Sequence, residues 1–208
     1  MGGYVVADRA SEAVRWAAFD RLRAGRAIAV ADLAADVQCG IDELGEVLGG
    51  LVAAGLLERD TDGIVVGSHG LTLRPTVHHL VLDGVALHTW CALDAVAIPA
   101  ALGVDAELTT CCGWCDQSLR VTAVAGRPQG GEELRVWVPG MDCENVLEQF
   151  CPFANLFCGS DHLEQWRVGA GEPPGHACMV TEIADLGPTW WSRDPDCCTP
   201  GAGERPPW

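Results

Sequence analysis

Residues 88–103 read HTWCALDAVAIPAALG, and the fold of the chain is decided around this stretch. Its apolar run predicts a helix that packs into a core, and Pro99 should end or kink that helix. A thiol at Cys91 and a carboxyl at Asp94 interrupt the run. Because a lone carboxylate is costly to bury, the pair indicates either a functional site or a buried cysteine beside a helix-surface aspartate.

The size and charge of the chain limit the classes of protein to which it can belong. Its 208 residues suffice for one substantial domain or two small ones. No apolar stretch approaches the roughly 20 residues that span a bilayer, and the first residues lack the order of a secretory signal. We therefore expect a cytoplasmic protein with no membrane partner. The formal net charge of −16 repels phosphate backbones and argues against nucleic acid as a partner.

Eleven cysteines are the most unusual feature of the composition. An odd number without a signal peptide argues against a secreted disulfide framework. In a reducing compartment, abundant thiols favour soft-metal or redox chemistry. Some of them should be plain core residues, because free cysteine packs as a small hydrophobe.

Upstream of the central stretch, the sequence predicts a small helical domain. Helical periodicity occurs in residues 11–25, 29–39 and 40–60. Residues 56–66, LLERDTDGIVV, have the pattern of a hairpin with Asp-Gly in its turn. Three helices followed by a hairpin are typical of a winged helix. We therefore predict a winged-helix-like N-terminal domain in residues 1–66.

Downstream, the sequence predicts a mixed α/β catalytic core with a small sheet in residues 67–190, so the whole chain is expected to be α+β. Strand candidates are residues 106–112, 118–125 and 134–140. Helix candidates are residues 160–168 and residues 142–151, the latter capped by Asp142. Residues 177–187 should be a strand that runs into a helix. Residues 191–208 are rich in proline and glycine, and we predict that they form a flexible tail that carries Cys197 and Cys198.

Two stretches together carry a family resemblance. GLTLRPTVHHLVLDGVALHTWCALDAVAIPAALG at residues 70–103 is followed by FCPFANLFCGS at 150–160, and HLEQWRVGAG and MVTEIADLG come after them in that order. Across about residues 68–186 the sequence resembles the organomercurial (alkylmercury) lyase family, with TWCALDA as the most distinctive block. A winged-helix-like region ahead of the catalytic core also suits that family.

This resemblance implies a role for individual residues. Cys91 matches the first catalytic cysteine of the family, Asp94 the catalytic aspartate, Cys151 the second catalytic cysteine, and Cys112 a further cysteine with a structural role. The implied reaction is protonolysis of a carbon–mercury bond, from R–Hg⁺ and H⁺ to R–H and Hg²⁺. No cofactor is implied. Mercury(II) would stay bound as product at Cys91, Cys151 and Asp94, with free thiols as its exchange partner and an organomercurial as the substrate.

The chemistry of these residue types fits that reaction. Mercury(II) is soft, so thiolates bind it far better than oxygen or nitrogen ligands do. Two thiolates on one R–Hg centre push negative charge onto the carbon, which then takes a proton from Asp94 as general acid. We expect the helix N-terminus to lower the pKa of Cys91 and an apolar wall to raise that of Asp94. Trp90, Phe150 and Phe153 are candidates for the lining around R, although each is also an ordinary core residue.

Two further cysteine pairs stand apart from this set. Cys112 and Cys115 have the spacing of zinc knuckles and redox pairs. Cys197 and Cys198 would have to complete a zinc site with them, and adjacent cysteines chelate a tetrahedral metal awkwardly, so this site is disfavoured. By analogy with the vicinal cysteines of mercuric reductases, Cys197 and Cys198 are candidate mercury ligands that remove product or pass it to a reductase. The alternative is a tail with two spare thiols.

Two other functions stay open on the sequence alone. The protein could be a family member without lyase activity that binds or acts on another thiophilic metal or substrate, a role that the additional Cys111, Cys115 and Cys158 would suit. It could also be a winged-helix metal-sensing regulator that uses the same thiols to control DNA binding. The net charge of −16 argues against the regulator.

Overall fold

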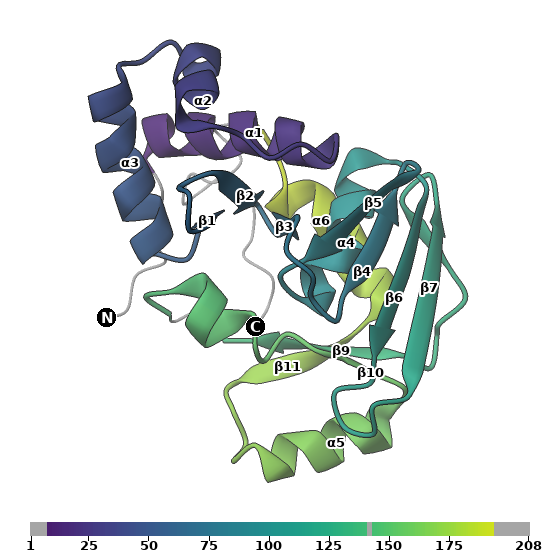
Figure 1. Ribbon diagram of the computed structural model, residues 1–208. Coiled ribbons are helices and arrows are strands. Elements are labelled where there is room, and N and C mark those ends of the chain that lie inside the picture. The colour runs from purple at the N-terminus through teal and green to yellow at the C-terminus, as the bar shows by residue number, and fades with distance from the viewer. Residues whose placement is uncertain (1–7, 141–142, 194–208) are drawn as a thin grey trace.

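The computed structural model describes residues 8–140 and 143–193 of the chain (Figure 1). Within them the fold is α+β, as predicted. A group of helices lies at one end, a large antiparallel sheet forms the body, and a second, smaller sheet lies below it with one helix beneath (Figure 1). None of the described helices is both long enough and apolar enough to cross a lipid bilayer.

The N-terminal part begins with helices α1 (Arg9–Arg23), α2 (Val30–Val37) and α3 (Ile41–Ala53). Strands β1 (Leu57–Arg59) and β2 (Val65–Ser68) then pair as an antiparallel hairpin. These elements agree with the predicted helices and hairpin. Apolar residues spaced at helical intervals pack between them into a core of their own, which includes Leu22, Leu33, Leu44, Leu48 and Val65.

The main sheet is larger than the sequence predicted. Its further strands are β3 (Leu71–Thr72), β4 (His79–Leu82), β5 (Val85–Thr89), β6 (Ala106–Cys111), β7 (Ser118–Val124) and β8 (Arg127–Gln129). Within the described residues it has eight strands in the order β1-β2-β3-β5-β4-β6-β7-β8. The expectation of a small sheet was wrong because the short strand β3 pairs with both β2 and β5 and joins the N-terminal hairpin to the sheet of the core.

The second sheet is built from the C-terminal third of the chain. Strand β9 (Arg135–Pro139) pairs antiparallel with β10 (Leu156–Phe157) and with β11 (Gly175–Met179). Helix α5 (Ser160–Gly169) follows β10, and helix α6 (Val180–Trp190) follows β11. Both helices and the strand that precedes α6 agree with the predicted elements.

A regular helix does not form where residues 142–151 predicted one. The chain makes a single π-helical turn, η1 (Val146–Phe150), and Asn145 caps it by accepting the backbone N–H of Glu148 at 3.0 Å. The expected cap, Asp142, lies outside the described residues. Such one-turn π segments are frequent beside functional sites.

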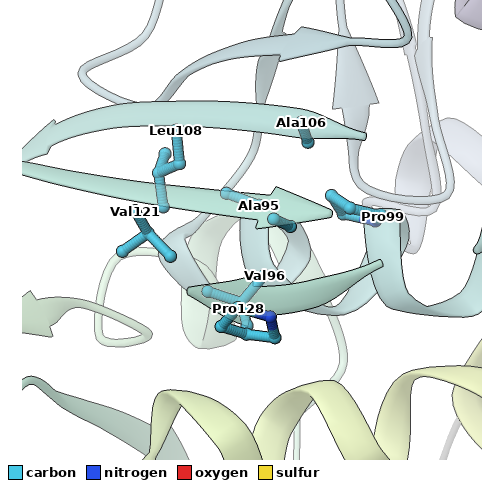
Figure 2. Close-up of a pocket in the computed structure, with 8 residues that line it drawn as sticks. Ala95, Val96, Pro99, Ala106, Leu108, Val121 and Pro128 are labelled. Atoms are coloured by element: carbon cyan, nitrogen blue, oxygen red, sulfur yellow. The ribbon is translucent and has the colours of Figure 1, made fainter. Parts of the chain in front are cut away.

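Helix α4 (Ala92–Leu102) is the central stretch of the sequence, and it is buried between the main sheet and α6. Pro99 lies inside it without ending it, since the helix continues to Leu102. Figure 2 shows a small gap between α4 and the strands β6, β7 and β8, lined by Val96, Leu108 and Val121 among other apolar residues. Its volume of about 10 Å³ has room for no more than one water molecule, so this gap is not a substrate site.

Candidate active site

Cys91 occupies the junction between strand β5 and helix α4. It is the residue that directly precedes the helix, with extended backbone angles, and its side chain is fully buried. Its carbonyl oxygen accepts the hydroxyl of Thr89 at 2.9 Å and the backbone N–H of Ala95 at 3.3 Å. Cys91 was expected to lie at the N-terminus of this helix. The helix in fact begins at the next residue, and Thr89 fixes the cysteine backbone in place.

Asp94 lies one turn further along α4, directly beside Cys91. The Cys91 thiol donates to the Asp94 carboxylate, with Sγ and Oδ2 3.1 Å apart. The Asp94 side chain is only 7% exposed, so the alternative of a helix-surface aspartate is wrong. The acid is therefore part of the core, and its proton-accepting oxygen faces the thiol.

Gly70 packs directly against the Asp94 side chain, a contact that was not predicted from the sequence. Its backbone φ is +85°, and a Cβ atom at this position would lie 2.5 Å from Cγ of Asp94. Its carbonyl oxygen accepts the backbone N–H of Trp90 at 2.9 Å. Glycine is therefore required here for both its conformation and its lack of a side chain. A glycine before a strand is visible in the sequence, but nothing in the sequence says which side chain it meets.

Cys151 comes from a segment far away in the sequence, directly after the π-helical turn. Its backbone N–H donates to the carbonyl of Val146 at 2.9 Å, and its side chain is 6% exposed. The following loop returns to helix α4, where the backbone N–H of Ala92 donates to the carbonyl of Ala154 at 3.0 Å. This hydrogen bond joins the two segments next to both cysteines.

The three side chains converge on one point. The Sγ atoms of Cys91 and Cys151 and a carboxylate oxygen of Asp94 all lie within 4.8 Å of one another. The structure thus brings together the three residues that the resemblance selected. Cys197 and Cys198, the other candidate mercury ligands, lie outside the described residues. Two sulfur atoms beside a carboxyl group are a ligand set that could hold a soft metal ion.

Burial sets the protonation states of Cys91 and Asp94. Loss of water raises the pKa of Cys91 well above its usual range, and the neighbouring Cys151 and Asp94 raise it further. The expectation that the helix N-terminus lowers the pKa of Cys91 was wrong, because desolvation outweighs the helix dipole. Burial also raises the pKa of Asp94 to about 6, as predicted in direction, while the hydrogen bond from Cys91 opposes the shift. Near neutral pH the site therefore holds a protonated thiol that is hydrogen-bonded to a carboxylate.

The N-terminal part supports both cysteine segments. The Asn145 side chain, which caps the turn before Cys151, donates to the carbonyl of Ala53 at the end of α3 at 3.1 Å. The indole N–H of Trp90, next to Cys91, donates to the Glu58 carboxylate on β1 at 2.5 Å. The helices and the hairpin thus contact the chain on either side of the site.

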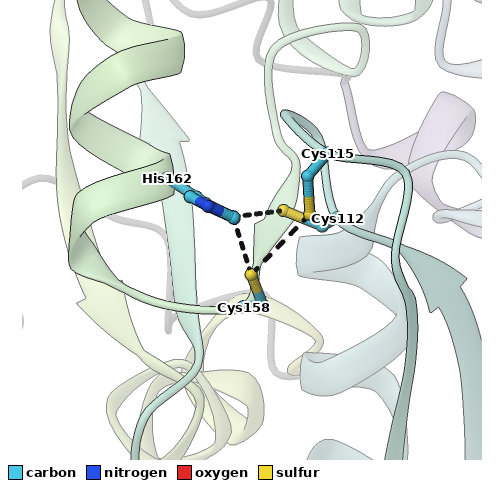
Figure 3. Close-up of side chains that lie close together, drawn as sticks. All are labelled: Cys112, Cys115, Cys158 and His162. Carbon is cyan, nitrogen blue, oxygen red and sulfur yellow. Dashed lines mark hydrogen bonds between the residues drawn. The ribbon is translucent and has the colours of Figure 1, made fainter.

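A second cluster of metal-ligating side chains lies at the end of the main sheet (Figure 3). It contains Cys112, Cys115, Cys158 and His162, whose ligand atoms are also within 4.8 Å of one another. Burial acts to raise the pKa of Cys112, but backbone N–H groups of Cys115, Cys158 and Trp114 outweigh it and lower this pKa to about 6. Burial and the two neighbouring thiols raise the pKa of Cys158 to about 11. Cys112, which the resemblance marks as structural, belongs to this cluster and not to the first.

The partners of Cys112 and Cys115 differ from those considered in the sequence. The tail cysteines Cys197 and Cys198 were the other close pair, whereas the structure places Cys158 and His162 beside them. His162 was not among the candidate ligands that the sequence suggested. The spacing Cys-x-x-Cys followed by Cys-x-x-x-His was the available signal for this group.

The fold places two buried thiols beside a buried carboxyl group, an arrangement that could hold a soft metal ion next to a proton donor. The sequence profile of the alkylmercury lyase family matches residues 71–192. The alkylmercury lyase of Streptomyces lividans is 39% identical over 188 residues, which cover 85% of this chain and 84% of that protein. That of Staphylococcus epidermidis is 31% identical over 169 residues, covering 80% and 76%. The chain therefore belongs to the alkylmercury lyase family, which confirms the resemblance.

A solved structure agrees with this assignment at the level of the fold. The mercury-bound form of MerB2 superposes with a TM-score of 0.82 at 19% sequence identity, covering 88% of this chain and 90% of that one. The chain is thus an enzyme of the alkylmercury lyase family. Neither a metal-sensing regulator nor a member without lyase activity is favoured.

Proposed function

We propose that the protein cleaves carbon–mercury bonds by protonolysis with Cys91, Asp94 and Cys151, releasing R–H and retaining mercury(II). The observation that carries this assignment is the convergence of two sulfur atoms and a carboxylate oxygen within 4.8 Å in a buried site. No cofactor takes part in the scheme, because the sulfur atoms supply the electron density and the carboxyl group supplies the proton.

The first step binds the organomercurial to Cys91. The substrate arrives as R–Hg bound to a small thiol. The carboxylate of Asp94, which already accepts the Cys91 S–H, takes this proton as the sulfur bonds to mercury. Cys91 needs this base because burial keeps it protonated near neutral pH.

The second step brings Cys151 onto the same mercury atom. Each cysteine loses one proton in the full reaction. One of these two protons leaves on the displaced small thiol, and Asp94 delivers the other to the carbon. Two sulfur ligands weaken the carbon–mercury bond and make the carbon basic. The protonated acid then delivers its proton, the carbon leaves as R–H, and mercury(II) stays between the two sulfur atoms.

Removal of water favours this chemistry. A buried site strengthens each charge interaction at the reacting atoms, and the raised pKa of Asp94, about 6, lets this group both take and return a proton near neutral pH. Phe150, which is buried, and Trp90 are proposed to line the space for the R group. Phe153, two residues after Cys151, is 36% exposed and is proposed to stand at the entrance.

Product release is proposed to depend on other thiols. Free small thiols exchange onto mercury and detach it from Cys91 and Cys151. Cys197 and Cys198 are proposed to assist as a vicinal pair and to pass mercury(II) to a mercuric reductase. Truncation after Ser192 should then slow multiple turnover at limiting free thiol, whereas an equal rate for the full and truncated chains would remove this role.

The N-terminal residues 1–66 are proposed to form a winged-helix-like domain that serves as a platform for the catalytic core in residues 67–190. The contacts from Ala53 to Asn145 and from Glu58 to Trp90 support this role. A cytoplasmic location, with its pool of free thiols, suits a chain whose described cysteines form no disulfides.

The assignment can be tested by measuring benzene released from phenylmercury in excess thiol. Cys91→Ser and Cys151→Ser should each reduce release to the uncatalysed background, because neither single sulfur activates the carbon. Cys39→Ser, which removes a half-buried thiol between α2 and α3, is the matched control and should retain full activity. Wild-type activity in either catalytic variant would refute the assignment.

A further inference from the structure

We propose that Cys112, Cys115, Cys158 and His162 form a structural zinc site that is separate from the active site. The four ligand atoms come from two segments, the turn between β6 and β7 and the start of helix α5 (Figure 3). The alkylmercury lyase reaction as proposed uses none of them. The site would hold a resident metal ion, whereas Cys91 and Cys151 bind mercury only as substrate and product.

The distances match a tetrahedral metal. With Zn–S near 2.3 Å and Zn–N near 2.1 Å, a tetrahedron has ligand-to-ligand edges of about 3.6–3.8 Å. The Sγ atoms of Cys115 and Cys158 are 3.9 Å apart, and Sγ of Cys112 lies 3.8 Å from Nδ1 of His162. The third edge, between Sγ of Cys158 and Nδ1 of His162, is shorter at 2.8 Å, because these two atoms hydrogen-bond to each other. The remaining edges are within 4.8 Å. A small withdrawal of the imidazole would complete the tetrahedron.

Backbone hydrogen bonds hold the first ligand pair in a tight turn. The N–H of Cys112 donates to the carbonyl of Gln117 at 2.8 Å, and the N–H of Asp116 donates to the carbonyl of Cys112 at 3.1 Å. Backbone N–H groups that follow Cys112 also point at its sulfur atom. Such N–H groups stabilise a thiolate, which is the form that a metal requires.

The second pair is positioned by the start of a helix. Cys158 lies two residues before α5, and His162 lies in its first turn, so their side chains meet on one side of the helix start. The sulfur of Cys158 and the imidazole thus both face the turn that carries Cys112 and Cys115.

The ligand set distinguishes zinc from other metals and from the mercury site. Three sulfur atoms and one imidazole nitrogen at tetrahedral spacing are the ligands of structural zinc, and they leave no open position for a substrate. Calcium and magnesium prefer oxygen ligands. Cys91 and Cys151, by contrast, offer two sulfur atoms beside an acid, which suits a substrate that must also receive a proton.

The proposed zinc ion would restrain the loop that carries Cys151. This loop runs from Cys151 through β10 to Cys158, and it is already held to the main sheet by the N–H of Gly113, which donates to the carbonyl of Leu156 at 2.9 Å. A Cβ atom at Gly113 would lie 3.0 Å from the Asn155 side chain, so the two segments are in close contact. A metal bridge at Cys158 would hold this contact together and keep the second catalytic cysteine in place.

The test is the zinc content of the full chain produced without mercury, measured by mass spectrometry of the metal after desalting. Wild type should contain about one zinc per chain, and Cys158→Ser and His162→Ala should each lower this at least about tenfold. Cys111→Ser is the matched control, because this exposed thiol adjoins Cys112 but lies outside the cluster, and it should keep its zinc. His162→Cys should also keep zinc, since it replaces one ligand by another.

Two results would overturn the proposal: wild type with almost no zinc after production in zinc-supplemented medium, or Cys158→Ser with as much zinc as wild type. A Cys91→Ser/Cys151→Ser double variant separates this site from the active site, since it should lose lyase activity and retain its zinc. Loss of zinc in the double variant would place the metal on the catalytic thiols and refute a separate site. Cobalt in place of zinc should give the strong thiolate absorption of a tetrahedral centre, and its absence would also contradict the proposal.

Discussion

Replacement of Asp94 by asparagine should stabilise the protein at neutral pH although it removes the proton donor. The pKa of the buried acid is about 6 in the folded chain against 3.8 when exposed. A difference of about two units at roughly 1.4 kcal/mol each corresponds to about 3 kcal/mol of unfolding free energy. Asparagine has a similar shape, can accept the Cys91 S–H and carries no charge, so it avoids this cost.

The sign of the effect follows from proton binding. The folded state binds the Asp94 proton more tightly than the unfolded state does, so this residue favours folding below pH 3.8, and that contribution is lost as the pH rises through about 6. The asparagine variant has no such loss. Its advantage over wild type should therefore grow between pH 4 and pH 6.5 and level off at up to about 3 kcal/mol.

The measurement is urea unfolding of both chains at a series of pH values, with the difference in unfolding free energy plotted against pH. Asp62→Asn, which removes an exposed carboxylate from the β1–β2 turn, controls for the loss of one surface charge. A difference between wild type and Asp94→Asn that does not change with pH would refute the burial argument. In benzene release, the same variant should be slower by about 10²–10⁴-fold, the usual contribution of a general acid.

Three further outcomes follow from the site. The value of kcat/KM should rise with pH through about 6, because Asp94 must be ionised to take the proton of Cys91. Initial rates between pH 5 and 8 measure this, and a flat profile would contradict the proton transfer from Cys91 to Asp94. Gly70→Ala should be less stable than Gly84→Ala and much less active, because both glycines have positive φ but only a Cβ at Gly70 would meet the Asp94 side chain. Urea unfolding and benzene release compare the two variants, and equal losses would argue against the contact. Asn145→Ala should cost about 1 kcal/mol of stability and lower kcat, because it removes the cap before Cys151 and the hydrogen bond to Ala53. Unchanged stability and unchanged kcat would show that the N-terminal helices do not position Cys151.

Much of the secondary structure could be predicted because it depends on local periodicity. The helical repeat in residues 11–25 and the apolar run around α4 identify these elements without any tertiary information. The size of the main sheet could not be predicted, because strand β3 has only two residues and exists through its pairing with β2 and β5. The turn before Cys151 was expected to be a longer helix, since its π-helical form depends on the cap and the contacts of Asn145.

The three residues of the site were selected by family resemblance, and their convergence depends on contacts that no local pattern contains. The hydrogen bond from Ala92 to Ala154 joins the two segments, and Gly70 packs against the acid from a third. The pKa of Cys91 was predicted in the wrong direction, because the helix start is visible in the sequence and complete burial is not. His162 was missed for a related reason, since its partners lie on a distant turn.

The most direct test of carbon–mercury protonolysis is a single-turnover reaction with methylmercury in D₂O. The headspace is analysed by mass spectrometry, and protein-bound mercury is measured after desalting. The wild-type chain should release monodeuterated methane in an amount equal to the mercury(II) that it retains, and Cys151→Ser should release none above background. Methane from Cys151→Ser at the wild-type level, or no methane from the wild-type chain, would contradict the account.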